Sequence, residues 1–188
     1  MRVPLDGLTL SLLPDDPGPE HAAAREFCLA VIKQHYGFDY RQDWHGDLDS
    51  LLLSPEKNHY SAANRGAFWT LKAPHGAIAA TAAIKVLSWQ PTVLADIGPR
   101  YSDISKTATL VRAYVAKERR GGGIGKWLNE LCESHARASG YSLMYLHAST
   151  DAPATIAFWK RCGYVEFGAF GFSTHFDKPL GGSKETQA

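Results

Sequence analysis

A glycine-rich turn between a strand and a helix is the feature that most constrains this sequence. Three glycines, Gly121–Gly123, and a fourth, Gly125, follow a β-branched and aromatic run at 109–115 that predicts a strand. Glycine adopts positive φ readily because it has no Cβ atom, so the backbone can turn sharply here. A strand, a glycine turn and a helix in this order are typical of an α/β domain.

An amphipathic helix follows the glycines and is predicted to end near Gly140. Its apolar positions recur every three or four residues, which is the period of one helix face. The residues of that face are Ile124, Trp127, Leu128, Leu131, Cys132 and His135. The first turn of any helix has backbone N–H groups without intrahelical acceptors, and these groups carry a partial positive charge.

The turn therefore predicts a binding site for a phosphate or pyrophosphate group. Arg119, Arg120 and Lys126 place full positive charges beside it. Two nucleotide-binding motifs are excluded by their spacing. A P-loop requires Ser or Thr after the Gly-Lys pair, where this sequence has Trp127, and a dinucleotide fingerprint requires glycine where it has Lys126.

The rest of the sequence predicts further strands and helices on both sides of this unit. Strands are predicted at 8–13, 67–72, 77–87, 143–148, 164–170 and 172–176. Helices are predicted at 19–36, at about 48–53, and from Pro153 to Arg161 with Thr150 or Asp151 as N-cap and Gly163 after its end. Residues 88–107 show no clear period and predict a long loop. We expect a single domain over 1–180 and a disordered tail at 181–188.

Composition limits the partners and the compartment. Among the 188 residues, 20 Lys and Arg face 19 Asp and Glu, which leaves a formal charge of +1. This balance gives no support for a nucleic-acid or membrane-surface partner.

Cys28, Cys132 and Cys162 are far apart and are expected to be buried thiols on apolar helix faces. The sequence shows no signal-peptide pattern and no membrane-length apolar run, and together with the free cysteines this predicts a cytoplasmic protein. The histidines are scattered and predict no metal site.

The pattern Arg-x-x-Gly-x-Gly, formed by Arg120, Gly123 and Gly125, resembles the coenzyme loop of the GNAT superfamily of acyl-coenzyme A-dependent N-acyltransferases. Residues 110–115 resemble the strand that leads into that loop, and 154–164 resemble a later helix of the family. The resemblance implies an α/β (α+β) fold. Its sheet would be mixed, mostly antiparallel and of about seven strands, flanked by about four helices and splayed between the fourth and fifth strands.

The resemblance also implies which residues bind the coenzyme. Backbone groups of the fourth strand would pair with the pantetheine arm, and amides of the glycine turn would hold the pyrophosphate. Trp159 is expected at the coenzyme too, at a position where many members carry a tyrosine that protonates the departing thiolate. An indole N–H is not a useful acid, so that role is open here. The expected coenzyme-binding residues are Ala113, Tyr114, Val115, Arg120, Gly121, Gly122, Gly123, Ile124, Gly125, Lys126 and Trp159.

The general base is also open. Some relatives carry a glutamate on the fourth strand, where this sequence has Thr109. The candidates to replace it are His147, Asp103 and Ser149. Histidine has a pKa suited to accepting a proton near neutral pH, but His147 can equally be a hydrogen-bonded structural residue beside Tyr145. Asp103 can be a solvated loop residue, and Ser149 can cap the turn before the next helix.

The function that the resemblance implies is transfer of an acetyl group from acetyl-CoA, the co-substrate, to a primary amine of a small molecule by direct attack in a ternary complex. A protein lysine or N-terminus as acceptor, and a non-catalytic acyl-CoA sensor, are the alternatives. A homodimer is possible. Trp44-His45-Gly46-Asp47 either borders the acceptor pocket with acidic and aromatic groups or is a solvated connector with one buried tryptophan.

Overall fold

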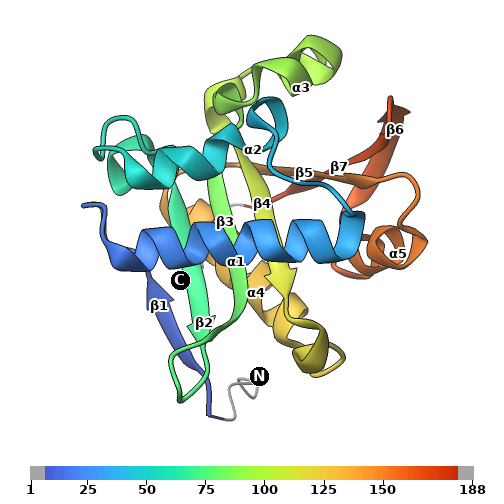
Figure 1. Cartoon of the computed structure of the whole chain (residues 1–188). Coiled ribbons are helices and arrows are strands. Elements are labelled where there is room, and N and C mark those ends of the chain that lie inside the picture. Colours follow the sequence, from blue (N-terminus) through green and yellow to red (C-terminus); the bar gives the residue numbers. More distant parts are fainter. Residues whose placement is uncertain (1–6, 182–188) are drawn as a thin grey trace, which may run out of the picture. The chain divides into compact units, whose positions relative to one another are not determined.

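The computed structural model describes residues 7–181 of the chain (Figure 1). The strands are β1 (Thr9–Leu12), β2 (Ala67–Lys72), β3 (Ile78–Val86), β4 (Thr107–Val115), β5 (Leu143–Ser149), β6 (Val165–Phe170) and β7 (Ser173–Pro179). The α-helices are α1 (Pro19–Tyr36), α2 (Gln42–Asp49), α3 (Pro91–Ile97), α4 (Ile124–Ala138) and α5 (Pro153–Arg161). The strands form one sheet in the order β1-β2-β3-β4-β5-β7-β6, in which only the β4–β5 pairing is parallel among those assigned. The expected mixed, mostly antiparallel fold is confirmed, with five α-helices where about four were expected.

The described chain divides into two compact units. The first unit comprises residues 7–85 and 111–132, and the second comprises residues 86–110 and 133–181. The division passes through β4 and α4, so each of these elements contributes to both units. Each unit is described in turn.

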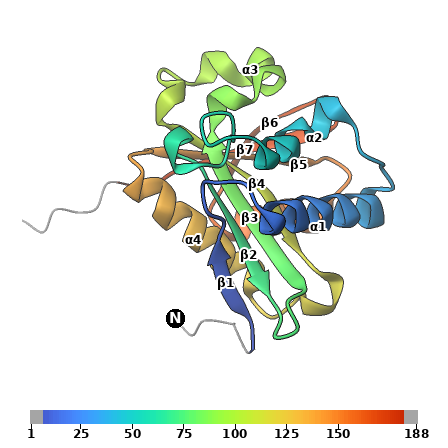
Figure 2. The same ribbon diagram turned by 60° about the vertical axis from the view of Figure 1, so that its left-hand side comes forward.

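In the first unit, β2 and β3 are buried along almost their whole length. A strand that is covered on both faces usually has a continuous run of apolar residues. Strand β3 has such a run, made mostly of small residues, Ile-Ala-Ala-Thr-Ala-Ala-Ile. The alanines allow helices to approach the sheet closely. Figure 2 shows α1 on one side of these strands and the beginning of α4 on the other.

Helix α1 has the bounds that the sequence predicts. Pro19 is at its first position, and Gly37 ends it in the left-handed region with φ 73°. Its inner face buries Ala24, Cys28 and Ile32 against Phe68 of β2. Burying an isoleucine side chain such as that of Ile32 stabilises the fold by about 1.5–3 kcal/mol relative to leaving it exposed. Helix α1 therefore forms chiefly because its apolar face is covered.

In the second unit, β5, β7 and β6 form an antiparallel ladder that places Tyr145 opposite Asp177 and His147 opposite His175. The start of β4 pairs in parallel with β5 over Thr107–Thr109 and Leu143–Tyr145. This pairing covers three residues of each strand, and β5 continues to Ser149. The short pairing is what the expected splay between the fourth and fifth strands requires.

Three local predictions are wrong. The helix expected at about 48–53 begins earlier, as α2 over Gln42–Asp49, and only a single turn of 3-10 helix follows. The expected loop at 88–107 contains α3, which has one buried residue, Ile97. Helix α2 has eight residues and α3 has seven, about two turns each, which is too few to establish a period. The N-cap of α5 is Ala152, and neither Thr150 nor Asp151 caps it.

Other expectations have mixed outcomes. Cys28 and Cys132 are buried as expected, whereas Cys162 is half-buried because it lies just beyond the end of α5. Gly163 follows α5 with φ 87°, as a C-terminal cap requires. Residues 182–188 of the expected tail lie outside the described residues. Within 7–181, no helix is long and apolar enough to cross a membrane, and no cluster of His, Cys, Asp or Glu suited to a metal ion occurs.

Candidate active site

The glycine turn before α4 depends on backbone conformations that other residues adopt with strain. Gly121 has φ 85° and Gly123 has φ 86°. A Cβ atom at either position would meet no atom within 4 Å, so the turn needs glycine for its dihedral angles and not for space. The first helical hydrogen bond joins Trp127 N to Gly123 O at 3.0 Å. The N–H groups of the residues just before Trp127 therefore have no acceptor within the helix.

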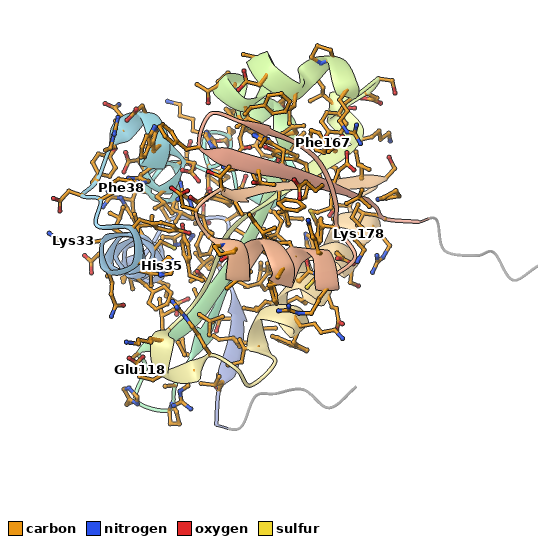
Figure 3. The ribbon with its side chains drawn as sticks, turned by 90° about the vertical axis from the view of Figure 1, so that its right-hand side faces the viewer. Lys33, His35, Phe38, Glu118, Phe167 and Lys178 are labelled. Carbon is orange, nitrogen blue, oxygen red and sulfur yellow. The ribbon has the colours of Figure 1, made fainter. Side chains whose placement is uncertain are left out.

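Two positive side chains line part of a hollow beside this turn. The hollow has a volume of about 170 Å³ and is lined by Gln34, His35, Lys117 and Arg120. Figure 3 shows His35 on the last turn of α1 and Glu118 in the turn that follows β4. The Nε atom of Arg120 donates to Val115 O at 2.9 Å, which ties the Arg120 side chain to the end of β4. Two cations, two further polar side chains and exposed amides suit a phosphate group.

The strand that leads into the turn is distorted at Arg112. Its φ is 53°, an unusual value for a residue other than glycine. Thr81 Oγ1 donates to the displaced Arg112 carbonyl at 2.8 Å, and Ala116 N donates to Ala79 O at 2.9 Å further along. Between these bonds Ala113 is exposed, and Tyr114 and Val115 are half-buried. Backbone groups at a distortion of this kind are available to a ligand that lies along the strand.

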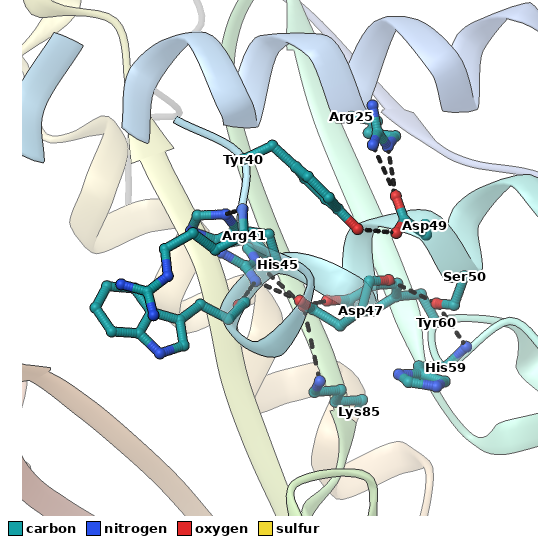
Figure 4. A network of polar contacts seen from close by, with 12 residues as sticks. Arg25, Tyr40, Arg41, His45, Asp47, Asp49, Ser50, His59, Tyr60 and Lys85 are labelled. Carbon is teal, nitrogen blue, oxygen red and sulfur yellow. Dashed lines mark hydrogen bonds and ion pairs between the residues drawn. The ribbon is translucent and has the colours of Figure 1, made fainter. Parts of the chain in front are cut away.

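A buried ion cluster holds the Arg112 side chain. Asp47 of α2 accepts hydrogen bonds from Arg112 and from the hydroxyl of Tyr60, and Lys85 Nζ lies 3.7 Å from the same carboxylate. Arg112 Nη2 also donates to Trp44 O at 3.0 Å. Figure 4 shows Asp47 at the centre of these contacts. We call Asp47, Tyr60, Lys85 and Arg112 the Asp47 cluster.

Electrostatics within the Asp47 cluster follow from burial and proximity. Burial alone would raise the pKa of Asp47, but Arg112, Lys85 and the hydrogen bonds hold that pKa well below its usual range. Burial lowers the pKa of Lys85, and Asp47 only partly offsets this effect. Burial and the Lys85 charge also lower the pKa of the nearby His59 to about 4.

Both interpretations of the segment 44–47 are wrong in part. Trp44 is 46% exposed, so it is not a buried tryptophan in a solvated connector. Asp47 is buried, and its carboxylate is already bound to two cations of the protein, so it is not an open acidic group for a cationic amine. The sequence contains no signal that joins Asp47 to Arg112, because 65 residues separate them.

The expected catalytic residues of the second unit have different surroundings. His147 is exposed, and its Nδ1 atom lies 3.2 Å from the hydroxyl of Tyr145. Ser149 Oγ accepts from Asp151 N at 3.3 Å, as a turn-capping residue does. Asp103 accepts from the backbone and the hydroxyl of Ser105, whose hydrogen bonds lower its pKa and so weaken it as a base.

Thr109 and Trp159 do not supply the missing acid or base. Thr109 is buried, and its Oγ1 atom has no hydrogen-bond partner among residues 7–181. Trp159 is also buried, with its ring against Phe158 and Tyr164. Of the three candidates for general base, His147 combines exposure with a titratable side chain of suitable pKa class.

Comparison with known proteins identifies the class. The model of the Acetyltransferase (GNAT) family matches residues 26–164. The chain belongs to the GNAT acetyltransferase family. It is 35% identical to the IAA acetyltransferase of Azospirillum brasilense over 75 residues, which are 37% of this chain and 49% of that protein. The chain therefore matches about half the length of this curated relative.

Solved structures share the fold at low sequence identity. A GNAT-family acetyltransferase from Staphylococcus aureus Mu50 superposes with a TM-score of 0.68 and 16% identity over 92% of this chain and all of that chain. The structure of yncA from Salmonella typhimurium, solved with its cofactor acetyl-CoA, gives a TM-score of 0.67 and 14% identity over 97% of this chain and 99% of that chain.

Proposed function

We propose that this chain is an N-acetyltransferase that moves an acetyl group from acetyl-CoA to a primary amine of a small molecule. The observation that carries the proposal is the segment 112–126, where a distorted strand, two positive-φ glycines and a helix start follow one another. Such a segment offers backbone groups to an extended ligand and amides to an anion without a break. Acetyl-CoA has this combination of a pantetheine arm and a pyrophosphate.

The residues present fit acetyl-CoA. The backbone from Ala113 to Val115 would bind the pantetheine arm, and the amides from Gly121 to Lys126 would bind the pyrophosphate. Lys117 and Arg120 line the adjoining hollow and would neutralise phosphate charge. When bound, acetyl-CoA supplies an activated thioester. That yncA of Salmonella typhimurium has the same fold and was solved with acetyl-CoA supports the choice of co-substrate.

The reaction needs a neutral amine held against the thioester. Positioning supplies much of the acceleration in such a two-substrate complex. A general base increases the rate by a further factor of about 10²–10⁴. His147 is the residue of the second unit that suits this role.

The test measures the release of free thiol from acetyl-CoA across a panel of small amines and a lysine peptide, with product masses to identify the acceptor. We expect saturable thiol release with at least one small amine and a product heavier by one acetyl group. Transfer only to the peptide would replace the small-molecule acceptor with a protein. Binding of acetyl-CoA without turnover on any amine would contradict an enzymatic role and favour a sensor.

A further inference from the structure

Three ring side chains of the second unit form a hydrogen-bonded cluster on β5 and β7. The hydroxyl of Tyr145 lies 2.7 Å from Nδ1 of His175 and 3.2 Å from Nδ1 of His147. The antiparallel register places His147 directly opposite His175. Tyr145 and His175 are buried, whereas His147 is exposed. We call these three residues the Tyr145 cluster.

The number of protons restricts the tautomers of the two histidines. A phenol has one proton to donate, so it can donate to one Nδ1 atom and must accept from the other. An O–H donor makes shorter hydrogen bonds than an N–H donor, and the Tyr145–His175 contact at 2.7 Å is shorter than the Tyr145–His147 contact at 3.2 Å. The hydroxyl of Tyr145 therefore donates to Nδ1 of His175, and a neutral His175 carries its proton on Nε2. That Nε2 atom is buried and has no hydrogen-bond partner among residues 7–181.

The tautomer of His147 then follows. Tyr145 donates to His175, so the Tyr145 oxygen accepts from Nδ1–H of His147. The Nε2 atom of a neutral His147 is therefore the unprotonated one, and its lone pair can take a proton. In the opposite arrangement, Nε2 would carry the hydrogen, and a neutral His147 would not act as a base through that atom.

The surroundings keep the two buried members of the cluster neutral. Burial raises the pKa of Tyr145 well above its usual value, and the nearby Tyr101 and Asp96 raise it further. Burial lowers the pKa of His175, against the opposing effects of Asp96 and the Phe170 carbonyl. Arg100 and Asp177, whose strand neighbours the cluster, pair with each other at 2.6 Å.

The aromatic neighbours restrict movement of the rings. Phe170 meets His175 edge-on with ring centres 5.2 Å apart, and Phe167 lies 6.1 Å from the same ring. Tyr145 is also in the apolar cluster formed with Leu87 and Ile97. A side chain that is fully enclosed in this way holds its hydroxyl in one place. Packing therefore holds the Tyr145 hydroxyl and the His175 ring in place, and the two distances indicate the direction of the hydrogen bonds.

We propose that Tyr145 and His175 are positioning residues that hold His147 as the Nδ1–H tautomer, so that its Nε2 atom removes the proton from the acceptor amine. The inference rests on the proposed acetyltransferase function and names its general base. The amine nitrogen loses a proton to Nε2 as its bond to the acetyl carbon forms. The C–S bond then breaks, and the thiolate takes up the proton that His147 received, directly or through water.

The location of His147 along β5 agrees with this role. The pairing of β4 with β5 includes Thr109 and Tyr145, and His147 lies two residues further along β5 on the same face as Tyr145. His147 lies beyond the last of these β4–β5 pairs. The Tyr145 cluster is therefore built on strands, which hold a catalytic side chain more precisely than loops do.

The test combines kinetics with a direct measurement of the tautomer. Tyr145→Phe removes the hydroxyl and keeps the ring, and His147→Ala removes the base. Tyr101→Phe is the matched control, because it removes a neighbouring phenol whose hydroxyl donates to Asp177 at 3.4 Å. We expect kcat to fall about 10²–10⁴-fold in His147→Ala and at least about tenfold in Tyr145→Phe, while the KM for acetyl-CoA stays within about a factor of two, as uniform binding is intact.

The pH profile and nitrogen NMR separate positioning from mere structural support. The apparent pKa of the acidic limb of the kcat/KM pH profile should differ from wild type in Tyr145→Phe and equal it in Tyr101→Phe. Ring-nitrogen shifts of wild-type His147 should show the Nδ1–H tautomer, and Tyr145→Phe should show a mixture. Nε2–H in wild-type His147, or an active wild type with Tyr145→Phe equal to Tyr101→Phe, overturns the inference. Absence of thiol release by the wild type itself would instead refute the proposed function, and the catalytic role of His147 with it.

Discussion

Replacing Asp47 with asparagine tests whether the Asp47 cluster stabilises the first unit. Asparagine has nearly the same shape as aspartate, so Asp47→Asn changes charge and hydrogen bonding with little change in packing. The side chains of Asp47, Arg112 and Lys85 are only 11%, 12% and 3% exposed. Their charges therefore interact with little screening by solvent.

The expected loss follows from what the substitution leaves behind. Wild type has two cations and one carboxylate in the cluster, and the variant has two buried cations without a counter-charge. Removing one partner of a buried ion pair costs about 3–5 kcal/mol. That loss is a large part of the about 5–15 kcal/mol that stabilises a typical domain.

The assay is urea unfolding of wild type, Asp47→Asn and the matched control Asp39→Asn. Asp39 pairs with Lys33 at 2.7 Å, but these side chains are 81% and 69% exposed. An exposed pair contributes little, so the control should unfold at nearly the wild-type midpoint. We expect a large drop in midpoint for Asp47→Asn with an unchanged slope. A drop no larger than that of Asp39→Asn would refute the reasoning.

Two further predictions concern the same cluster. Lys85→Met leaves the Asp47–Arg112 pair balanced, so the free energy of unfolding should be unchanged or higher by up to about 2 kcal/mol; a loss of more than about 1 kcal/mol in urea unfolding would contradict it. Because the pKa of Asp47 is lower in the folded state than in the unfolded chain, its contribution is present above about pH 4 and is lost as the pH falls below that value. The acid-induced drop in unfolding free energy should therefore be smaller in Asp47→Asn than in wild type, and equal drops would argue against a lowered pKa.

The sequence predicts well where a local signal is strong. Pro19 and Gly37 mark the ends of α1, and the structure places that helix at the predicted bounds. The glycine turn and helix α4 are predicted equally well. Glycine determines the backbone of the turn, and a regular apolar period determines that of the helix. Helix α3 has seven residues and one buried position. It shows no hydrophobic period that would predict a helix, because tertiary packing determines its conformation.

The two polar clusters show what a single sequence does not reveal. His147 is a candidate because imidazole has a suitable pKa, which is a property of the residue itself. Its connection to His175 depends on the β5–β7 register. A change of one residue in that register would move every side chain of the strand to the other face of the sheet. Asp47 and Arg112 meet only because α2 packs where β4 is distorted. Such contacts follow from the fold and not from spacing in the chain.

Calorimetric titration of acetyl-CoA is the most direct test of the central claim that the glycine turn binds its pyrophosphate. Wild type is compared with Gly123→Ala and with Gly140→Ala, because Gly140 has φ 80° and equally open surroundings but lies at the far end of α4. Alanine at either position strains the backbone by about 1–2 kcal/mol, so both variants should lose similar stability. We predict saturable binding to wild type and Gly140→Ala, and a Kd at least about tenfold weaker for Gly123→Ala. Equal binding by all three proteins, or none by wild type, would contradict the account.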